Sequence, residues 1–261
     1  MGAERRYRVR RARAPIPAEL LAVDDVLARD TTRVLQVGER TTVGAVQSRE
    51  GELVLKRFHE RTLARVLETM ALGSGAARVW RGAERLAAAG FETPEILAVL
   101  ERPALGLPVW SCAIARHVSG PSLDVLWRSR TGAARRRLTI AFADYLRRLH
   151  AAGIYPQDLR GANVLVPCED PPRFVLVDVD RVRRYRRLSW RRRRKNLVQI
   201  HRSVGRGAPP RDALRFLRRY LGVPVAGALR DAVVDVLRLA ATKDAEYAGR
   251  RSAAAARARS G

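Results

Sequence analysis

The chain has 261 residues, and 47% of them are hydrophobic, which is enough for a globular core in one large domain or two small lobes. Its formal net charge of +25 indicates an anionic partner such as nucleic acid, an anionic membrane face or a phosphorylated substrate. No apolar run approaches the roughly 20 residues of a membrane-spanning helix, and the basic N-terminus lacks the apolar stretch of a signal peptide. We therefore expect a soluble, cytoplasmic protein that associates at most with the inner face of the cytoplasmic membrane.

The first half of the chain alternates strand patterns with one long helical pattern. Residues 1–18 are rich in arginine, and we expect a loose basic arm there. Apolar and polar residues then alternate in five predicted strands, at 33–37, 41–47, 53–55, 96–100 and 109–115. A helix is predicted over 74–89, with Ser74 as its N-cap and Gly90 as its stop. Residues 116–120 follow the last of these strands and are predicted to form a hinge between two lobes.

The second half of the chain is mostly helical in pattern. Helices are predicted at 122–130, 135–151, 196–204, 211–220 and 226–241. Two short strands, at 164–166 and 174–177, are separated by the proline-containing turn 167–172. The end of the chain, 246–261, is an alanine- and arginine-rich segment of low complexity that we expect to be a flexible tail.

The most informative pattern runs from Asp158 to Asp178. Asn163 stands five residues after Asp158, and Asp178 ends an apolar strand fifteen residues later. Phosphoryl transfer by kinase-like enzymes needs an Asp that orients the acceptor hydroxyl, and an Asn and an Asp that hold the metal ions on ATP. Lys56, one of only three lysines in the chain, ends a strand where such an enzyme places its phosphate-binding lysine. The pattern therefore predicts a kinase that uses ATP and Mg²⁺.

Lys56, Asp158, Asn163 and Asp178, in this order, resemble the protein-kinase-like superfamily. Further segments resemble one branch, the lipopolysaccharide kinases of the Kdo/heptose kinase type and their InaA-like relatives. These segments are Val54-Leu-Lys56-Arg-Phe, Trp80-Arg81, Thr93-Pro94, Gly153-Ile-Tyr, the pair Asp178-x-Asp180, Arg187-Leu-Ser and Asn196-Leu-Val-Gln-Ile-His-Arg-Ser. The resemblance covers roughly residues 30–222 and implies phosphorylation of a sugar hydroxyl on a lipid-linked anionic glycan.

The resemblance also implies a fold. It is α+β and bilobal, with a small antiparallel sheet and one main helix in the first lobe and a mostly helical second lobe. The expected boundaries are 1–18 for the basic arm, 19–116 for the first lobe, 117–245 for the second lobe and 246–261 for the flexible tail.

The residues that match the family receive roles from it. Asp158 is expected to orient or deprotonate the acceptor hydroxyl, and Arg160 to assist the transferring phosphate electrostatically. Asn163, Asp178 and Asp180 are the expected metal ligands, since Mg²⁺ prefers oxygen donors. Asp180 is equally suited to an ion pair with an adjacent arginine.

The nucleotide is expected to contact the first lobe and the hinge. Arg40 and Thr41 lie in a turn that would cover the ATP phosphates, although the turn lacks a glycine-rich GxGxxG motif. The backbone at Arg116 and Val118 would meet the adenine edge. Lys56 would bind the phosphates, paired with a helical glutamate, for which Glu84 is the first candidate and Glu68 the second.

Other interpretations remain open. Pro156 stands where the family commonly has a histidine, which is consistent with a catalytically weak pseudokinase acting as a regulatory module. A kinase for a protein or for another small-molecule hydroxyl would use the same residues. The basic block 181–195 suits a phosphorylated sugar, a lipid head group or plain solvent exposure. We do not expect a nucleic-acid partner, because no nucleic-acid-binding signature is present, and the sequence does not set the oligomeric state.

Overall fold

The structure is a computed structural model that describes residues 7–49, 51–59, 63–104, 107–205, 208–222 and 226–259. It divides into two compact units. Unit 1 comprises Met1–Ser119 and Val175–Arg183, and unit 2 comprises Gly120–Phe174 and Arg184–Gly261. The first boundary lies close to the predicted hinge. Residues 175–183 also belong to unit 1, whereas the predicted boundaries place them in the second lobe.

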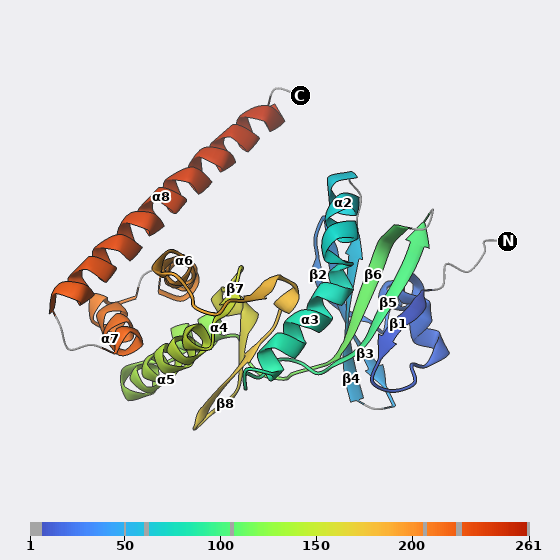
Figure 1. The fold of residues 1–261 in the computed structure, drawn as a ribbon, viewed down its shortest axis with the longest axis horizontal. Coiled ribbons are helices and arrows are strands. Elements are labelled where there is room, and N and C mark those ends of the chain that lie inside the picture. Colours follow the sequence, from blue (N-terminus) through green and yellow to red (C-terminus); the bar gives the residue numbers. More distant parts are fainter. Residues whose placement is uncertain are drawn as a thin grey trace. The chain divides into compact units, whose positions relative to one another are not determined.

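Unit 1 contains an antiparallel sheet of six strands in the order β1-β5-β6-β4-β3-β2 (Figure 1). The strands are β1 (Arg8–Ala12), β2 (Arg33–Val37), β3 (Thr41–Ser48), β4 (Gly51–His59), β5 (Ile96–Ala104) and β6 (Leu107–Arg116). The five predicted strands are present. The prediction of a loose arm is wrong for residues 8–12, because these residues form β1 and pair with β5. All side chains of β1 are exposed, so its sequence lacks the alternation that identifies a half-buried strand.

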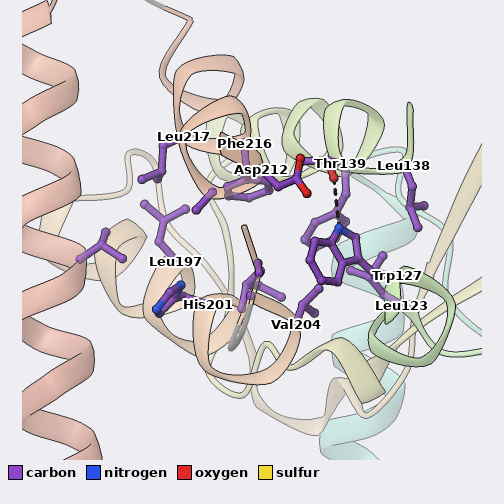
Figure 2. Close-up of a pocket in the computed structure, with 16 residues that line it drawn as sticks. Leu123, Trp127, Leu138, Thr139, Leu197, His201, Val204, Asp212, Phe216 and Leu217 are labelled. Carbon is purple, nitrogen blue, oxygen red and sulfur yellow. Dashed lines mark hydrogen bonds between the residues drawn. The ribbon is translucent and has the colours of Figure 1, made fainter. Parts of the chain in front are cut away.

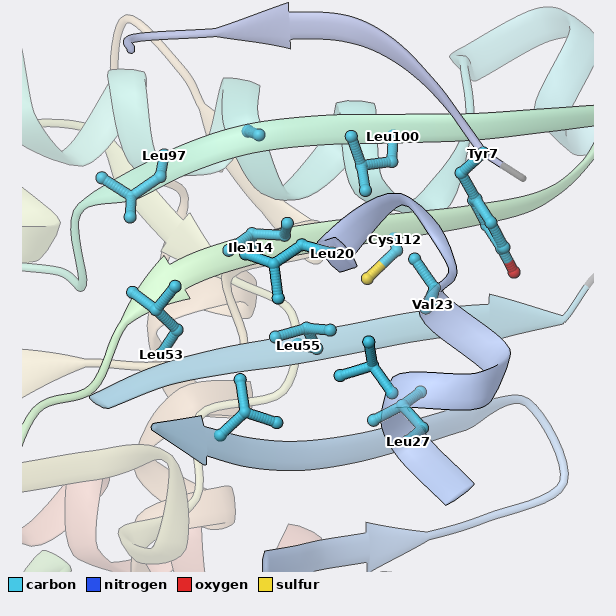
Figure 3. Packing of buried hydrophobic residues seen from close by; sticks show 13 residues of the cluster. Tyr7, Leu20, Val23, Leu27, Leu53, Leu55, Leu97, Leu100, Cys112 and Ile114 are labelled. Atoms are coloured by element: carbon cyan, nitrogen blue, oxygen red, sulfur yellow. The ribbon is translucent and has the colours of Figure 1, made fainter. Parts of the chain in front are cut away.

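Different helices cover the two faces of this sheet. The 3₁₀ turn η1 (Ala18–Leu21) and helix α1 (Val23–Ala28) pack on one face, where Leu20 lies beside Ile114 and Val23 beside Cys112 (Figure 3). Helices α2 (Leu63–Leu72) and α3 (Gly75–Ala87) belong to the other face. Gly75 allows α3 to begin directly against Phe58, because a Cβ at Gly75 would lie 2.3 Å from that ring. The predicted cap is confirmed, since the Ser74 hydroxyl accepts a hydrogen bond from the N–H of Ala77 at 3.2 Å.

The segment of unit 1 that returns after residue 174 holds short elements. They are the end of β9 (Pro172–Leu176), the 3₁₀ turn η3 (Val179–Arg181) and the start of β10 (Val182–Arg184). The N–H of Leu176 donates to the carbonyl of Glu92 at 3.0 Å, and η3 packs against α3. This segment carries Asp178 and Asp180, so both carboxylates belong to the same unit as Lys56.

Unit 2 is mostly helical, as predicted. Its helices are α4 (Leu123–Ser129), α5 (Gly132–Ala151), α6 (Trp190–Ile200), α7 (Pro210–Leu221) and α8 (Ala226–Arg259), and a π-helical turn η4 (His201–Gly205) extends α6. The strands β7 (Ile154–Pro156) and β8 (Val164–Glu169) flank the 3₁₀ turn η2 (Gly161–Asn163). Helix α8 is one continuous helix that includes most of the residues for which the sequence predicts a flexible tail (Figure 1). Among the described residues, no helix has the length and apolar composition of a membrane span.

Unit 2 contains an apolar pocket of ≈ 70 Å³ (Figure 2). Leu123, Phe216 and Leu217 line it, and Trp127 donates a hydrogen bond from Nε1 to Thr139 Oγ1 at 3.1 Å.

Candidate active site

Lys56 and two carboxylates meet in unit 1. In the sheet, Lys56 on β4 lies opposite Val43 on β3 and Ala113 on β6. Its ammonium group donates to Asp178 Oδ1 and lies 3.8 Å from Asp180 Oδ1. Three residues predicted from the sequence to serve one site are therefore in contact, although 122 positions separate Lys56 from Asp178.

The backbone at Asp178 is left-handed, with φ 57° and ψ 55°. It is the only non-glycine residue with positive φ in the described part of the chain. Aspartate tolerates this conformation better than most residues because its short polar side chain can bond locally. The conformation turns the chain from β9 into η3, so that Asp178 and Asp180 both lie within reach of Lys56.

The environment of Asp180 favours a bound cation. Burial, reinforced by the neighbouring Asp178 carboxylate, raises the pKa of Asp180 to about 6, while Lys56 and Arg181 oppose the rise. The side chain of Asp180 is 13% exposed. Two adjacent carboxylates, one of them poorly solvated, form the hard oxygen environment that a divalent cation stabilises. The residues present therefore fit the expected Mg²⁺.

Helix α3 positions this segment through its backbone contacts. A Cβ at Gly82 would lie 1.9 Å from the carbonyl oxygen of Val179, so only glycine allows η3 to approach α3 this closely. Arg85 Nη1 also donates to the carbonyl of Val182 at 2.9 Å. The helix therefore holds the chain on both sides of Asp180.

The expected pair between Glu84 and Lys56 is wrong for this structure. The exposed Glu84 accepts a hydrogen bond from Trp80 Nε1 of its own helix at 2.6 Å, and the described ion pairs of Lys56 are with Asp178 and Asp180. The face of α3 toward η3 carries Gly82, and Glu84 lies on the solvent side of the helix. Helical spacing alone did not identify the face that meets the site. The second candidate, Glu68, is carried by α2.

Arg40 lies in the turn between β2 and β3, as predicted, whereas Thr41 is the first residue of β3. The carbonyl of Thr41 accepts from the N–H of Gly38 at 2.9 Å, and the carbonyl of Arg40 accepts from the N–H of His59 at 2.9 Å. Thr41 is paired with Phe58 on β4, so their side chains are on the same face of the sheet. Lys56 lies two residues before Phe58 on the same strand, and its side chain is therefore on that face as well.

The predicted adenine contacts lie at the end of β6. The N–H of Arg116 already donates to the carbonyl of Glu95 at 2.9 Å, and its guanidinium pairs with the Glu95 carboxylate at 2.8 Å. Val118, two residues further along, is half-buried.

The second group of candidate residues belongs to unit 2. Arg160 donates from Nε and Nη2 to the two carboxylate oxygens of Asp158, each at 2.7 Å. Asn163 Nδ2 donates to the backbone carbonyl of Asp158 at 3.0 Å. These bonds fix the plane of the Asp158 carboxylate and the shape of the loop that carries it.

Two amide side chains of α6 support the loop from below. Asn196 Nδ2 donates to the carbonyl of Pro156, and Gln199 Nε2 donates to the carbonyl of Gln157, at 2.7 and 2.8 Å. Gln199 Oε1 accepts from the N–H of Leu159 at 3.2 Å. The backbone on either side of Asp158 is thereby bonded to a single helix.

Further residues extend this support. Ser203 Oγ accepts from the N–H of Gly161 at 2.9 Å. The buried His150 contacts Asn196 Oδ1 through Nε2 at 3.0 Å and the Tyr220 hydroxyl through Nδ1 at 2.7 Å. An amide oxygen only accepts, so the imidazole carries its proton on Nε2 and accepts from the tyrosine at Nδ1.

No role was predicted for these supporting residues. Asn196, Gln199 and Ser203 recur at i, i+3 and i+7, which places them on one helical face. This polar stripe in an otherwise basic segment was the available signal for a supporting role.

Comparison with known proteins gives the family. The model of the lipopolysaccharide kinase (Kdo/WaaP) family matches residues 23–220. A solved structure described as WaaP in complex with acyl carrier protein is similar with a TM-score of 0.61 and 24% identity, over 84% of this chain and 91% of that one. A comparison with curated protein sequences gave no match. The WaaP likeness confirms the predicted α+β, kinase-like fold. With its family model matched over most of its length, the chain belongs to the lipopolysaccharide kinase (Kdo/WaaP) family and is a phosphotransferase with an alcohol group as acceptor.

Proposed function

We propose that this kinase transfers the γ-phosphoryl group of ATP, with Mg²⁺, to a hydroxyl of a sugar in a lipid-linked anionic glycan of the lipopolysaccharide core type. The observation that carries the proposal is the contact of Lys56 with Asp178, beside the half-buried Asp180. An ammonium group next to two carboxylates suits a metal–nucleotide complex. The carboxylates can bind the metal ion, and the lysine can bind phosphate oxygens of the nucleotide.

The metal ligands supply oxygen donors. Asp178 and Asp180 would bind Mg²⁺ through their carboxylates, and Asn163 through its side-chain oxygen, which stays available because its Nδ2 makes the bond to the loop. When bound, Mg²⁺ neutralises charge on the phosphate oxygens. The left-handed backbone of Asp178 keeps its carboxylate in place before any ligand arrives.

Asp158 would orient the acceptor hydroxyl and take its proton as the oxygen attacks phosphorus. Its fork with Arg160 uses one lone pair on each carboxylate oxygen and leaves the others for the hydroxyl. The side chain of Arg160 is 62% exposed, so its positive charge is accessible to the transferring phosphoryl group. The pair would therefore position the acceptor and stabilise charge at the same time.

The charge on unit 2 supports a peripheral contact with the anionic inner face of the cytoplasmic membrane. Helices α5 and α7 form an open groove of ≈ 630 Å³ lined by Arg136, Arg147, Arg211, Arg215, Arg218 and Arg219, together with Ile140 and Leu214. Each basic residue near an anionic surface adds roughly 1 kcal/mol of attraction. Part of the basic block 181–195 instead contacts α8. Trp190 donates a hydrogen bond to Asp235 at 2.8 Å, and Arg194 forms an ion pair with it at 3.1 Å.

Radiolabelled ATP and a Gram-negative lipopolysaccharide preparation test the proposal. Asp158→Ala and Asp178→Ala should each abolish Mg²⁺-dependent label transfer, whereas the exposed Asp231→Ala on α8 should retain it. Unchanged turnover in the first two variants would refute the proposal. Binding of ATP and Mg²⁺, seen as a raised melting temperature without transfer to any acceptor, would favour the regulatory pseudokinase.

A further inference from the structure

Unit 1 also contains a polar pocket, and of the residues that line it only Arg85 and Asp180 have a role given above. It lies between α2, α3 and the residues after Asp180, and has a volume of ≈ 320 Å³. We call it the arginine pocket after four of the side chains that line it, Arg78, Arg81, Arg85 and Arg183. Asp180 is the only acidic residue in its lining. Four guanidinium groups and one carboxylate give it a strongly positive charge, and its volume is within the range of small-ligand sites.

The arginines are held in place by backbone carbonyls. Arg78, Arg81 and Arg85 lie at i, i+3 and i+7 on one face of α3. Arg78 Nη1 donates to the carbonyl of Gly73 at 2.9 Å, and Arg81 Nη2 donates to the carbonyl of Leu72. A guanidinium group has five N–H donors, so the bond of Arg81 fixes its position and leaves donors for a ligand.

A structural role for these arginines explains only part of the pocket. The carbonyls of residues 72 and 73 end α2, where cations are favourable, and this accounts for Arg78 and Arg81. It does not account for Arg183, whose side chain forms no hydrogen bond or ion pair with the described residues. Burial and the nearby Arg85 and Arg78 lower the pKa of Arg81, which shows that the gathered charges repel one another. A bound anion would relieve that repulsion.

We propose that the arginine pocket binds a phosphate or carboxylate group of the acceptor glycan and thereby places the acceptor beside Asp180. Planar guanidinium groups match both oxyanions with paired hydrogen bonds, which suits them to an anionic sugar. The inference rests on the proposed function, in which Asp180 is a metal ligand and so marks the position of phosphoryl transfer. It gives the anionic acceptor a binding site distinct from the basic surface of unit 2.

Inorganic pyrophosphate is a suitable probe, titrated calorimetrically in EDTA without nucleotide. The double variant Arg81→Gln/Arg183→Gln should bind it roughly tenfold or more weakly, since charge-assisted hydrogen bonds are lost. The matched control Arg29→Gln/Arg137→Gln removes the same charge from exposed positions and should bind within about twofold of the unaltered chain. Arg183→Gln alone gives a second test if the double variant fails to fold, because it breaks no described side-chain bond.

Two outcomes would overturn the inference. Equal weakening in the pocket variant and the control would mean that only the overall charge attracts the probe. Loss of binding in Lys56→Met, with full binding in the pocket variant, would place pyrophosphate at the nucleotide-phosphate site instead.

Kinetics with the lipopolysaccharide preparation separates this inference from the proposed function. In the pocket variant the KM for lipopolysaccharide should rise roughly tenfold, with a smaller change in the KM for ATP. An unchanged KM for lipopolysaccharide would contradict an acceptor site. If the unaltered chain transferred no phosphate from ATP, the proposed function would fail, while the pyrophosphate titration would still decide whether the pocket binds an oxyanion.

Discussion

The side-chain amide of Asn196 donates a 2.7 Å hydrogen bond to the carbonyl of Pro156, two residues before Asp158. Proline at this position replaces the histidine that the resemblance leads one to expect. Its ring offers no side-chain donor or acceptor, so support for the loop must come from elsewhere. Asn196 and Gln199 supply it from α6, which weakens the argument that Pro156 marks an inactive enzyme.

Asn196→Leu should therefore lower both phosphoryl transfer and stability. The substitution leaves the buried carbonyl of Pro156 and the His150 Nε2–H without their partner, and each unsatisfied group costs about 1–3 kcal/mol. We expect the loop to shift and kcat to fall by roughly 10–100-fold, the range seen when support for a functional group is lost. Steady-state kinetics and urea unfolding measure the two effects.

The neighbouring Lys195→Leu is the matched control, because Lys195 is exposed on the same helix. It should leave kcat close to that of the unaltered chain. A normal kcat in Asn196→Leu would show that the loop keeps its shape without α6.

His150 makes the stability of unit 2 depend on pH. Burial, with a further contribution from Arg193, lowers its pKa to about 4, compared with about 6.5 in an unfolded chain. Between these values the unfolded state binds the proton and the folded state does not. Stability is therefore complete above about pH 6.5 and declines as the pH falls toward 4, by up to roughly 3 kcal/mol. Urea unfolding at pH 7.5 and pH 5 measures the difference.

His150→Gln tests the assignment, because glutamine can replace one hydrogen bond but does not titrate. The variant should be less stable at pH 7.5 and should lose less stability between pH 7.5 and pH 5. The same pH dependence in both proteins would assign the effect to other groups.

The sequence predicted most of the fold because burial leaves a periodic pattern. Strand β4 and helix α3 each bury one side, β5 and β6 contain continuous buried runs, and the Ser74 cap marks a helix start. β1 has no buried face and is held by its backbone, so no pattern revealed it. Helix α8 continues past residue 241 through an alanine-rich stretch, whose low complexity suggested a tail although alanine favours helix.

The candidate site was predictable where chemistry restricts residue type and spacing. Lys56, Asp178 and Asp180 do meet in the structure, because an ammonium and paired carboxylates have specific uses. Glu84 was misassigned because the direction of a helical side chain depends on what the helix packs against. Asn196 and Gln199 donate to backbone carbonyls. Every residue has a backbone carbonyl, so the sequence could not identify which residues they bond to.

Lys56→Met should lower phosphoryl transfer by roughly 10²–10³-fold, the loss typical when one charge-stabilising donor is removed. It also leaves Asp178 and Asp180 without their shared cation. The effect should fall mainly on kcat/KM for ATP, measured at saturating acceptor. Lys195→Met is the control, since Lys195 is exposed and lies outside the nucleotide contacts. Comparable activity in both variants would contradict the role of Lys56.

Gly82→Ala should separate η3 from α3. The added Cβ would lie 1.9 Å from the carbonyl oxygen of Val179, and a backbone atom cannot move aside as a flexible side chain can. Asp178 and Asp180 flank Val179, so any shift of this carbonyl moves the proposed metal ligands. We expect a loss of roughly 1–3 kcal/mol in stability, as for other overpacked sites, and a much larger loss of Mg²⁺-dependent activity.

Ala87→Ser on the same helix adds one atom at an exposed position and is the control for a general effect on α3. It should change neither stability nor turnover appreciably. Raised Mg²⁺ should partly restore Gly82→Ala, because a displaced carboxylate weakens metal affinity without removing the ligand. If Gly82→Ala kept full activity at low Mg²⁺, the close approach of α3 to η3 would have no role in holding Asp178 and Asp180.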